Sequence, residues 1–572
     1  MGGRRAAGTE TDSPLGELIP APGSGSVAAA GRVRNRKIGA YLAAGALLFL
    51  VYLRLSMTSA LNSDSANILL AGDEMLHGNL LLHGWYASDV SFYSTEIPQY
   101  ALLVGVFGLR ASTAHIAAAM TYTLAFLLAV ALARAGARDG RQALIRTLIA
   151  GGIMLAPALG DGVFALDLSV GHVGTAVPLL VLWIILDRTD RIGVRRWQVP
   201  VAVAVLLAWV QLADPIVLAV GIAPLGLAAA VRLASRFRAG GLRAGGPRDV
   251  WYEASLLAAA VAAYGLAWVA EQVLRALGGY RVNVVSYHLT PVWNPGAARQ
   301  VLEIFGANAQ GLTGFQLVLA YAHLASVLLV AAALLVTAWR FGSRSLIDQA
   351  LALAVAANIG LFLFTSAATL PKPAHEVAIV VPFGAALAAR MLSRPQPRSG
   401  WLTAAGWLPA AGRLTADGWL PAAALATGSA VLAGYTAGLA WDTTRPAQPM
   451  TNVRLADWLA ARHLDYGLSG YWTSSSVTVD SRGTVDVRAL MQFTMKRDLW
   501  MSDERWYDPG RHYANFIVLD SDRGFFSHWE PTALISKYFG HPARTYRYGP
   551  YTILVWDRNL LPEIPGSLPP AR

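Results

Sequence analysis

The segment Leu61–Tyr100 reads LNSDSANILLAGDEMLHGNLLLHGWYASDVSFYSTEIPQY and differs sharply from the sequence around it. It is rich in acidic and aromatic residues, and it directly follows the apolar run Ile38–Met57, which is long enough to cross a bilayer. Asp64 lies a few residues past the end of that run. We therefore expect Leu61–Tyr100 to be a loop held at a membrane surface by the spans on either side of it.

The composition indicates that lipid rather than water surrounds much of the chain. Of the 572 residues, 55% are hydrophobic and 14% are charged, and the mean hydropathy is +0.43. Soluble domains carry roughly 25% charged residues. The formal net charge is +11, but the Arg residues recur in short clusters between apolar runs, as in cytoplasmic membrane loops, so no nucleic-acid partner is expected. The absence of cysteine excludes disulfides, thiolate metal sites and cysteine nucleophiles.

Apolar runs long enough to span a membrane recur through residues 38–441. About eleven such runs predict an α-helical polytopic membrane protein. The shorter run Pro98–Leu109 is interpreted as a juxtamembrane helix in the first loop, residues 58–112. The predicted spans are Ile38–Met57, Thr113–Arg134, Leu144–Leu159, His172–Asp187, Val199–Ala213, Pro215–Val231, Trp251–Ala276, Phe315–Trp339, Leu346–Ser366, His375–Met391 and Trp419–Trp441.

The Arg clusters fall in alternate loops, which places the N-terminus, a disordered tail over residues 1–37, in the cytoplasm. The first loop and everything after Trp441 are then extracytoplasmic, at the plasma membrane. The low-complexity repeat at residues 400–423 is interpreted as a cytoplasmic insertion. The clusters assigned to cytoplasmic loops are Arg134/Arg138/Arg141/Arg146, Arg188/Arg191/Arg195/Arg196, Arg232/Arg236/Arg238/Arg243/Arg248, Arg340/Arg344 and Arg390/Arg394/Arg398/Arg413.

Residues 442–572 have the composition of a soluble domain, and their size suits a small extracytoplasmic α/β domain. Helical periodicity and strand alternation predict its elements. These are a helix over Asn452–Leu464, a hairpin of Ser475–Val479 with Thr484–Val487, a strand at Phe516–Leu519, and a second hairpin within Tyr546–Trp556 that turns at Gly549-Pro550.

Many spans, a carboxylate just after the first one and a C-terminal outer domain together resemble the GT-C superfamily of integral-membrane glycosyltransferases. The chain is most similar to actinobacterial members that use lipid-phosphate sugars, in the group of protein O-mannosyltransferases and lipid A aminoarabinose transferases. The residues that carry the resemblance are Asn62-Ser63-Asp64, the loop DVSFYSTEIP at Asp89–Pro98, the acidic pair Asp161 and Asp167, and Gly470-Tyr471-Trp472.

The resemblance implies transfer of a sugar from a polyprenyl-phosphate donor to an extracytoplasmic acceptor, which is an envelope glycan, lipid or protein. An oxygen nucleophile needs a base, and in the family a first-loop Asp near the first helix is that base. Asp64 stands at this position, with Ser63, Ser65 and Asn67 as candidates to orient it. The alternative is that Asp64 only caps a helix over Ala66–Leu76.

Other residues expected on the same side of the membrane are candidates for binding the sugar or the phosphate. Asp89 and Glu96 share a Tyr- and Ser-rich segment, although Tyr93 could equally be an aromatic interface anchor. Lys372 and His375 flank a helix start, where backbone dipoles favour an anion. The substrate-binding candidates are Asp89, Tyr93, Glu96, Asp161, Asp167, His172, Arg281, Tyr287, His288, Lys372 and His375.

No histidine spacing matches a metal-binding pattern, and no cofactor is expected, although carboxylates could hold Mg²⁺ or Mn²⁺. Two other functions compete with the transferase. A transporter or lipid flippase would place ionisable residues inside its spans, whereas the spans here are nearly free of charge. A non-catalytic envelope scaffold is not excluded by the C-terminal residues alone. The sequence leaves the transferred sugar and the acceptor open.

Overall fold

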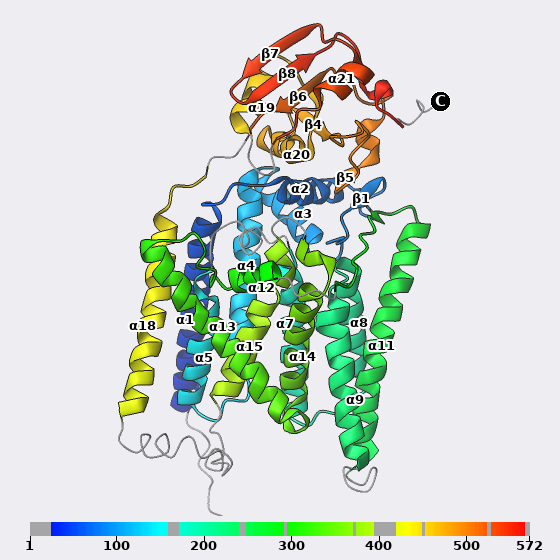
Figure 1. Ribbon diagram of the computed structural model, residues 1–572. Helices are drawn as coiled ribbons and strands as arrows, with labels where there is room; N and C mark the ends of the chain where they lie inside the picture. The colour runs from blue at the N-terminus through cyan, green and yellow to red at the C-terminus, as the bar shows by residue number, and fades with distance from the viewer. Residues whose placement is uncertain are drawn as a thin grey trace, which may run out of the picture. The chain divides into compact units, whose positions relative to one another are not determined.

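Long apolar helices dominate the structure, a computed structural model that describes residues 24–157, 171–238, 247–290, 295–369, 373–393, 419–448, 452–522 and 528–566 (Figure 1). A helix overlaps each of the predicted spans. These helices are α1 (Ser24–Ser56), α4 (Ala111–Arg134), α5 (Gly140–Leu155), α7 (Val173–Arg191), α8 (Gln198–Ala213), α9 (Ala223–Arg238), α11 (Pro247–Ala276), α13 (Gly314–Trp339), α14 (Leu346–Leu363), α15 (Val380–Leu392) and α18 (Trp419–Thr444).

Within the described residues, seven helices are long and apolar enough to cross a membrane. Two others, α5 and α8, have 16 residues each, and α7 carries several charges in its last two turns. The chain is therefore a mostly helical membrane protein, while the number of eleven crossings and the orientation of the termini remain predictions. The seven spans are Gly39–Ser56, Ala111–Arg134, Leu218–Arg238, Arg248–Ala276, Gly314–Trp339, Leu346–Leu363 and Ala374–Leu392.

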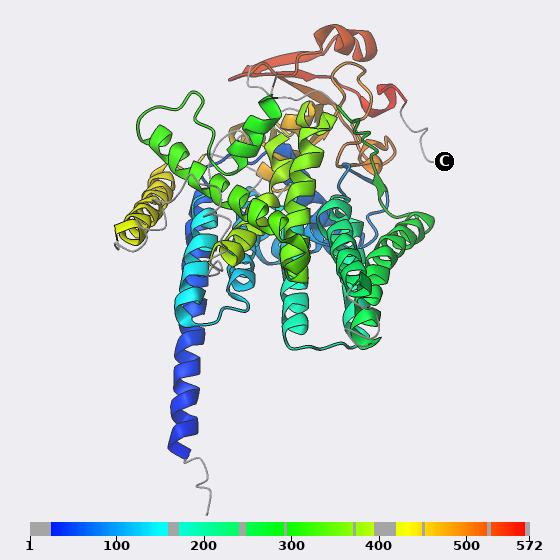
Figure 2. The ribbon, with the colours of Figure 1, turned by 60° about the horizontal axis from the view of Figure 1, so that its bottom comes forward.

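The chain forms two compact units, Met1–Leu48 and Phe49–Arg572, and all elements from α2 onward belong to the second. In that unit α8, α9 and α11 pack side by side, as the blue-green to green helices of Figure 2 show. A π-helical turn, η1 (Leu218–Ile222), leads into α9. Such turns are often found at functional sites, and η1 lies four residues after Asp214.

The first loop forms two short helices and a strand. Helix α2 (Ser63–Leu76) packs against α3 (Glu96–Phe107), which has 12 residues and is too short to span, as predicted for the juxtamembrane helix. Strand β1 (Trp85–Ala87) pairs in parallel with β2 (Arg281–Val282) and antiparallel with β5 (Ser502–Asp503). This small sheet therefore joins three segments that are far apart in the sequence. A further short helix, α12 (Pro295–Ile304), follows β2.

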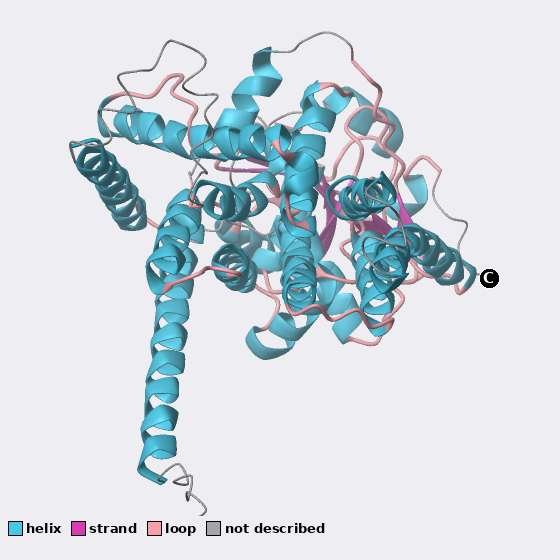
Figure 3. Ribbon diagram, turned by 90° about the horizontal axis from the view of Figure 1, so that it is seen from below, coloured by secondary structure: helices cyan, strands magenta, loops and turns pink. Residues whose placement is uncertain are grey.

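The C-terminal residues contain a five-stranded sheet of order β4-β3-β6-β8-β7, and the two sheets hold all the strands (magenta in Figure 3) of the described chain. Strand β3 runs parallel to β4 and β6, whereas β8 is antiparallel to β6 and β7. The elements are α19 (Val453–Ala460), β3 (Tyr466–Ser469), α20 (Tyr471–Asp480), β4 (Asp486–Ala489), β6 (Phe516–Asp520), α21 (Thr532–Phe539), β7 (Arg544–Tyr548) and β8 (Tyr551–Val555).

The strand at Phe516–Leu519 and the hairpin that turns at Gly549-Pro550 are confirmed. The predicted hairpin strand Ser475–Val479 is wrong, because these residues lie in helix α20. The alternation of Ser and Thr with Val is typical of a strand with one exposed and one buried face. In fact the hydroxyls are also buried, and Ser476 donates to the backbone carbonyls of the preceding helical turn.

A hydrophobic core joins the first loop to the C-terminal sheet. Side chains of α2 and α3, including Ile68 and Tyr100, belong to the same buried cluster as Leu468, Trp506 and Trp556. Each fully buried large apolar side chain contributes roughly 1.5–3 kcal/mol relative to an exposed one. The C-terminal region is thus packed firmly on the loop that contains Asp64.

Candidate active site

Asp64 lies in the first turn of α2 but does not cap this helix. The N-cap is Asn62, whose Oδ1 accepts a hydrogen bond from the backbone N–H of Ser65 at 3.0 Å. A cap residue has extended backbone and satisfies one free N–H group of the first turn. The alternative that Asp64 caps the helix is therefore wrong, and its carboxylate is free for other contacts.

The Asp64 carboxylate receives its shortest hydrogen bond from the C-terminal region. The Tyr471 hydroxyl donates to Oδ1 at 2.7 Å, and Asn62 Nδ2 lies 3.4 Å from Oδ2. Ser63 and Asn67, which we expected to orient Asp64 directly, contact Tyr471 instead. Ser63 Oγ donates to the Tyr471 carbonyl at 2.7 Å, and Asn67 Nδ2 donates to its hydroxyl at 3.1 Å.

Burial is the largest influence on the Asp64 carboxyl and raises its pKa above the ordinary value. The hydrogen bond from Tyr471 and the charge of His375 lower the pKa, since both stabilise the carboxylate. A carboxyl whose pKa is raised toward neutrality accepts a proton more readily than an exposed Asp does. These surroundings suit a general base.

Asp64 lines a cavity of about 210 Å³ that gathers side chains from distant parts of the chain. The first loop also supplies Asp89, and the C-terminal region supplies Trp500 and Met501. The residue before α7, the loop after β2 and the turn before α15 complete the lining. Their polar contributions are His172, Tyr287, His375 and Glu376.

Asp89 and Tyr287 form a hydrogen-bonded pair at the cavity wall, with the Tyr287 hydroxyl donating to Asp89 Oδ2 at 2.6 Å. Burial raises the pKa of the Asp89 carboxyl, and the hydrogen bond from Tyr287 lowers it. The pKa of Tyr287 is raised by burial first and by the carboxylates around it second, so the phenol stays protonated. Tyr287 therefore presents a fixed donor to Asp89.

His172 lies between two carboxylates. Its Nδ1 is 2.7 Å from Asp214 Oδ2, and its Nε2 is 3.1 Å from Glu376 Oε2. An acceptor at each ring nitrogen favours the imidazolium, which donates from both. Thr175 donates a second hydrogen bond to Asp214 at 2.6 Å. His172 caps α7 with φ +69°, a left-handed conformation that is uncommon outside glycine, and this strained backbone directs the ring into the cluster.

A larger cavity of about 510 Å³ continues from the Asp64 cavity, because the two share Asp89, His172, Tyr287 and Glu376 in their linings. A third cavity, of about 190 Å³, shares Asp89 and Glu271 with the second. The lining of the second cavity is mixed, and its polar residues include Glu271, Arg275, Asn283 and Asn358. Its apolar lining includes Ile216, Leu218, Ala219, Leu361 and Phe362.

Four predicted substrate-binding residues do not line the Asp64 cavity. The Tyr93 hydroxyl donates to the Leu80 carbonyl, Arg281 lies over the Tyr86 ring and bonds its hydroxyl, and the backbone of His288 pairs with Ser366. Glu96 lines a separate cavity of about 320 Å³. The residues that the structure brings to the Asp64 cavity are Asp89, His172, Tyr287 and His375, while Asp161, Asp167 and Lys372 lie outside the described residues.

Sequence reasoning missed four residues of this site, and it singled out a fifth, Tyr471, only as part of the resemblance at Gly470-Tyr471-Trp472. Asp214 and Glu376 adjoin segments that were singled out, but nothing in the sequence pairs either with His172. Trp500, Met501 and Tyr471 come from the C-terminal region, more than 400 residues after Asp64. Among the described residues no group of three or more His, Asp or Glu side chains is arranged to hold a metal ion.

The comparisons with known proteins give a fold. No family profile and no curated protein matches the sequence. The fold is similar to the crystal structure of ArnT from Cupriavidus metallidurans in the apo state, with a TM-score of 0.51 and 14% identity over 91% of this chain and 98% of that one. A second ArnT structure, bound to undecaprenyl phosphate, matches with a TM-score of 0.49 and 15% identity over 90% and 97%. The chain therefore has a fold similar to that of the ArnT crystal structure.

Proposed function

We propose that the protein is a membrane glycosyltransferase of the GT-C type, which transfers a sugar from a polyprenyl-phosphate donor to an extracytoplasmic acceptor with Asp64 as general base. The fold likeness to ArnT from Cupriavidus metallidurans supports the GT-C type. The actinobacterial subgroup, the cell-envelope acceptor and the plasma-membrane orientation belong to the same proposal. These three parts of the proposal are supported by the sequence alone.

One observation carries the proposal: Asp64 lines a cavity with several ionisable side chains, and this cavity continues into a larger one whose lining includes a set of apolar residues. A lipid-linked sugar has the same polarity, with a polar head on an apolar chain. The sugar and phosphate would lie among Asp89, His172 and Tyr287, and the prenyl chain would lie along Leu218 and Leu361. Leu218 and Leu361 are 43% and 48% exposed.

In the proposed step the acceptor hydroxyl attacks C1 of the donor sugar. Its proton passes to the Asp64 carboxylate, the new C1–O bond forms to the acceptor, and the C1–O bond to phosphate breaks with its electron pair leaving on the polyprenyl phosphate. Charge develops on that phosphate, where fixed donors and cations stabilise it. His375 in the lining of the Asp64 cavity and Arg275 in the lining of the larger cavity are the candidate cations among the described residues, and Lys372 is a further candidate from the sequence.

The rival functions are less well supported. A transporter would carry its ionisable residues in the middle of its spans, whereas Asp64, Asp89 and His172 belong to loops, caps and short helices at the helix ends. A scaffold would have no need of a buried carboxylate whose partners, Tyr471 and His375, come from two distant segments.

The decisive experiment compares purified wild type with D64N in assays with a panel of radiolabelled polyprenyl-phosphate sugars and extracted envelope acceptors. We expect wild type to transfer label from one of these donors and D64N to lose at least a hundredfold in kcat, because general-base catalysis contributes about 10²–10⁴-fold. D64N retains the size of the side chain, so its expression and melting temperature should match wild type. Equal transfer by D64N, or no transfer by wild type with any donor, would overturn the proposal.

A further inference from the structure

Tyr471 lies just beyond the carboxyl end of strand β3 in the C-terminal sheet. It is the first residue of α20 and directly follows β3 and Gly470. Strands β3 and β6 are parallel neighbours, and the chain leaves β3 toward β4 on one side and β6 toward β8 on the other. In sheets of this kind ligands bind beyond the carboxyl ends of the strands at the point where the strand order reverses. Here α20 packs on α2 at that place.

The Tyr471 hydroxyl has one proton to donate and can accept from others. It donates to Asp64 Oδ1 at 2.7 Å, since a carboxylate can only accept, and it accepts from Asn67 Nδ2 at 3.1 Å. Asn67 is 1% exposed. This chain of hydrogen bonds fixes the direction of the phenol proton toward Asp64.

The backbone at Tyr471 is held as firmly as its hydroxyl. Ser63 Oγ, one residue before Asp64, donates to the Tyr471 carbonyl at 2.7 Å. On the other side, Trp529 packs so closely on Gly470 that an added Cβ would lie 2.6 Å from its Cγ. The tyrosine is thus placed by contacts both to α2 and within the C-terminal region.

We propose, on the basis of the glycosyltransferase function above, that Tyr471 is the positioning residue for Asp64. It holds Oδ1 and leaves Oδ2 for the acceptor hydroxyl. Among the hydrogen bonds of the described residues, Oδ2 accepts a long one of 3.4 Å from Asn62 Nδ2. The C-terminal region therefore completes the base, beyond any part it plays in selecting the acceptor.

The test is Y471F, with Y551F as the matched control. Tyr551 lies on β8 of the same C-terminal region. Its hydroxyl donates a hydrogen bond to Asn452 Oδ1 at 2.7 Å and not to Asp64. A hydrogen bond to a charged group corresponds to about 10- to 100-fold in rate. We expect Y471F to lose that factor in kcat at neutral pH with less than about a twofold change in donor KM, and Y551F to match wild type.

The pH profile separates positioning from a general structural role. The Tyr471 hydroxyl stabilises the charged carboxylate, so its loss raises the pKa of Asp64 further. The acidic limb of kcat should therefore move to higher pH in Y471F, by about one unit. Carbodiimide-driven amidation of Asp64, followed by mass spectrometry across pH, reports the same shift without requiring turnover.

The two readouts distinguish the two proposals. If wild type transfers no sugar from any donor, the proposed function fails, and the amidation midpoint alone decides the role of Tyr471. A midpoint and a kcat in Y471F equal to wild type overturn the inference. If Y471F has a lowered melting temperature, N67L replaces it, because this change removes only the donor to the phenol and should shift the midpoint in the same direction by less. An unshifted N67L then overturns the inference.

Discussion

At the scale of single residues, Glu96 is a buried carboxyl that the proposed mechanism does not use. It begins α3, is 1% exposed, and packs where an added Cβ on Gly174 would clash with its Oε1. Burial raises the pKa of Glu96 from 4.5 to about 7, the hydrogen bond with Thr95 lowers it, and Asp214 raises it. Glu96 therefore titrates in the physiological range.

Because the pKa of Glu96 is raised in the folded protein, its contribution to stability is fully present below about pH 4.5 and is lost as the pH rises through about 7. The shift corresponds to about 3 kcal/mol. E96Q resembles the neutral acid at every pH, so its melting temperature in detergent should exceed that of wild type at pH 8 and match it near pH 4.5. D557N, at an exposed carboxylate, should follow wild type throughout. A wild-type and E96Q difference that is independent of pH would contradict the assignment.

The sequence singled out Asp64 as the proposed base but did not predict which residues contact it. Asp64 could be identified from its distance after an apolar run and from the resemblance to GT-C enzymes. Its local partners were chosen from neighbours in sequence, Ser63 and Asn67, yet both reach it through Tyr471. A contact between residues 407 positions apart has no signature in a single sequence.

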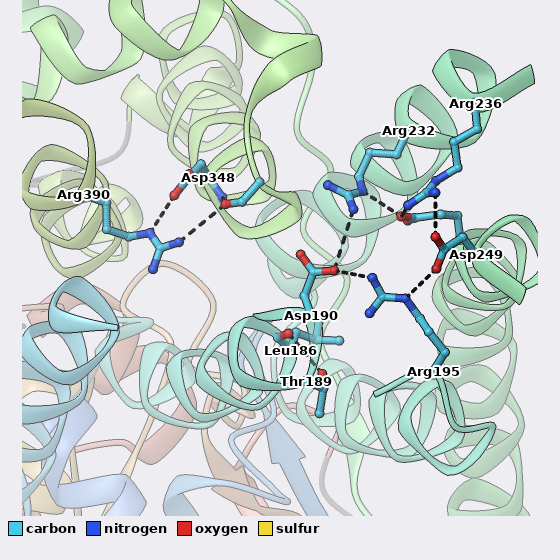
Figure 4. Close-up of polar contacts among 11 residues, drawn as sticks. Leu186, Thr189, Asp190, Arg195, Arg232, Arg236, Asp249, Asp348 and Arg390 are labelled. Carbon is cyan, nitrogen blue, oxygen red and sulfur yellow. Dashed lines mark hydrogen bonds and ion pairs between the residues drawn. The ribbon is translucent and has the colours of Figure 1, made fainter. Parts of the chain in front are cut away.

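At the scale of elements, buried ion pairs tie helix ends together. Arg390 in α15 bonds Asp348 of α14 at 2.6 Å, as Figure 4 shows, and Asp187 of α7 at 2.8 Å. All three side chains are at most 4% exposed. In a second cluster in Figure 4, Arg195 joins Asp190 at 3.0 Å and Asp249 at 3.2 Å. This second cluster links the end of α7 to α11.

Removing one partner of a buried ion pair leaves the others uncompensated, which costs about 3–5 kcal/mol. R390M should therefore lower the melting temperature sharply and reduce the yield of monodisperse protein. The matched control is R191M, since Arg191 also pairs with Asp187, at 2.7 Å, but its side chain is 45% exposed, and such pairs contribute about 0–1 kcal/mol.

The triple variant R390M/D187N/D348N neutralises the two carboxylates that lose Arg390 and should recover much of the loss that R390M suffers. Recovery would show that stranded carboxylates, rather than lost packing of the Arg390 stem, cause the instability. If R390M and R191M melted alike, the buried pairs would have no special role in holding α7, α14 and α15 together.

The elements themselves were predicted unevenly. Apolar length located a helix at every predicted span, because lipid requires about 20 apolar residues and leaves little room for another pattern. In the C-terminal region the prediction from alternation was wrong at α20. There Ser474, Ser476 and Thr478 are buried, and their hydroxyls donate hydrogen bonds to carbonyls of their own helix. Polar residues that turn inward remove the exposure pattern on which periodicity depends.

At the scale of the whole molecule, the association of the first loop with the C-terminal sheet could not be predicted. The sequence placed both on one side of the membrane, but the small sheet β2-β1-β5 and the shared core around Trp506 depend on pairings across hundreds of residues. The predicted orientation accounts for this association, since both partners would be extracytoplasmic.

The continuity of the cavities leads to a prediction about donor length. Ala219, on the π-helical turn η1, lines the larger cavity beside Ile216 and Leu218. A substituted Trp there would fill part of the space that the first isoprene units of a donor would occupy. The phosphate and sugar positions near His172 and Asp89 would remain.

We expect A219W to raise KM for a long-chain polyprenyl-phosphate sugar by about tenfold, the equivalent of about 1.4 kcal/mol of lost binding, while a short-chain analogue is affected less. The change in kcat should be small, because Asp64 and its partners are untouched. V261W is the matched control, since Val261 lies on α11 with 70% exposure and lines none of the three connected cavities. Steady-state assays with both donors decide the matter: an equal rise in KM for long and short chains, or an equal effect of V261W, would mean that the prenyl chain does not follow this groove.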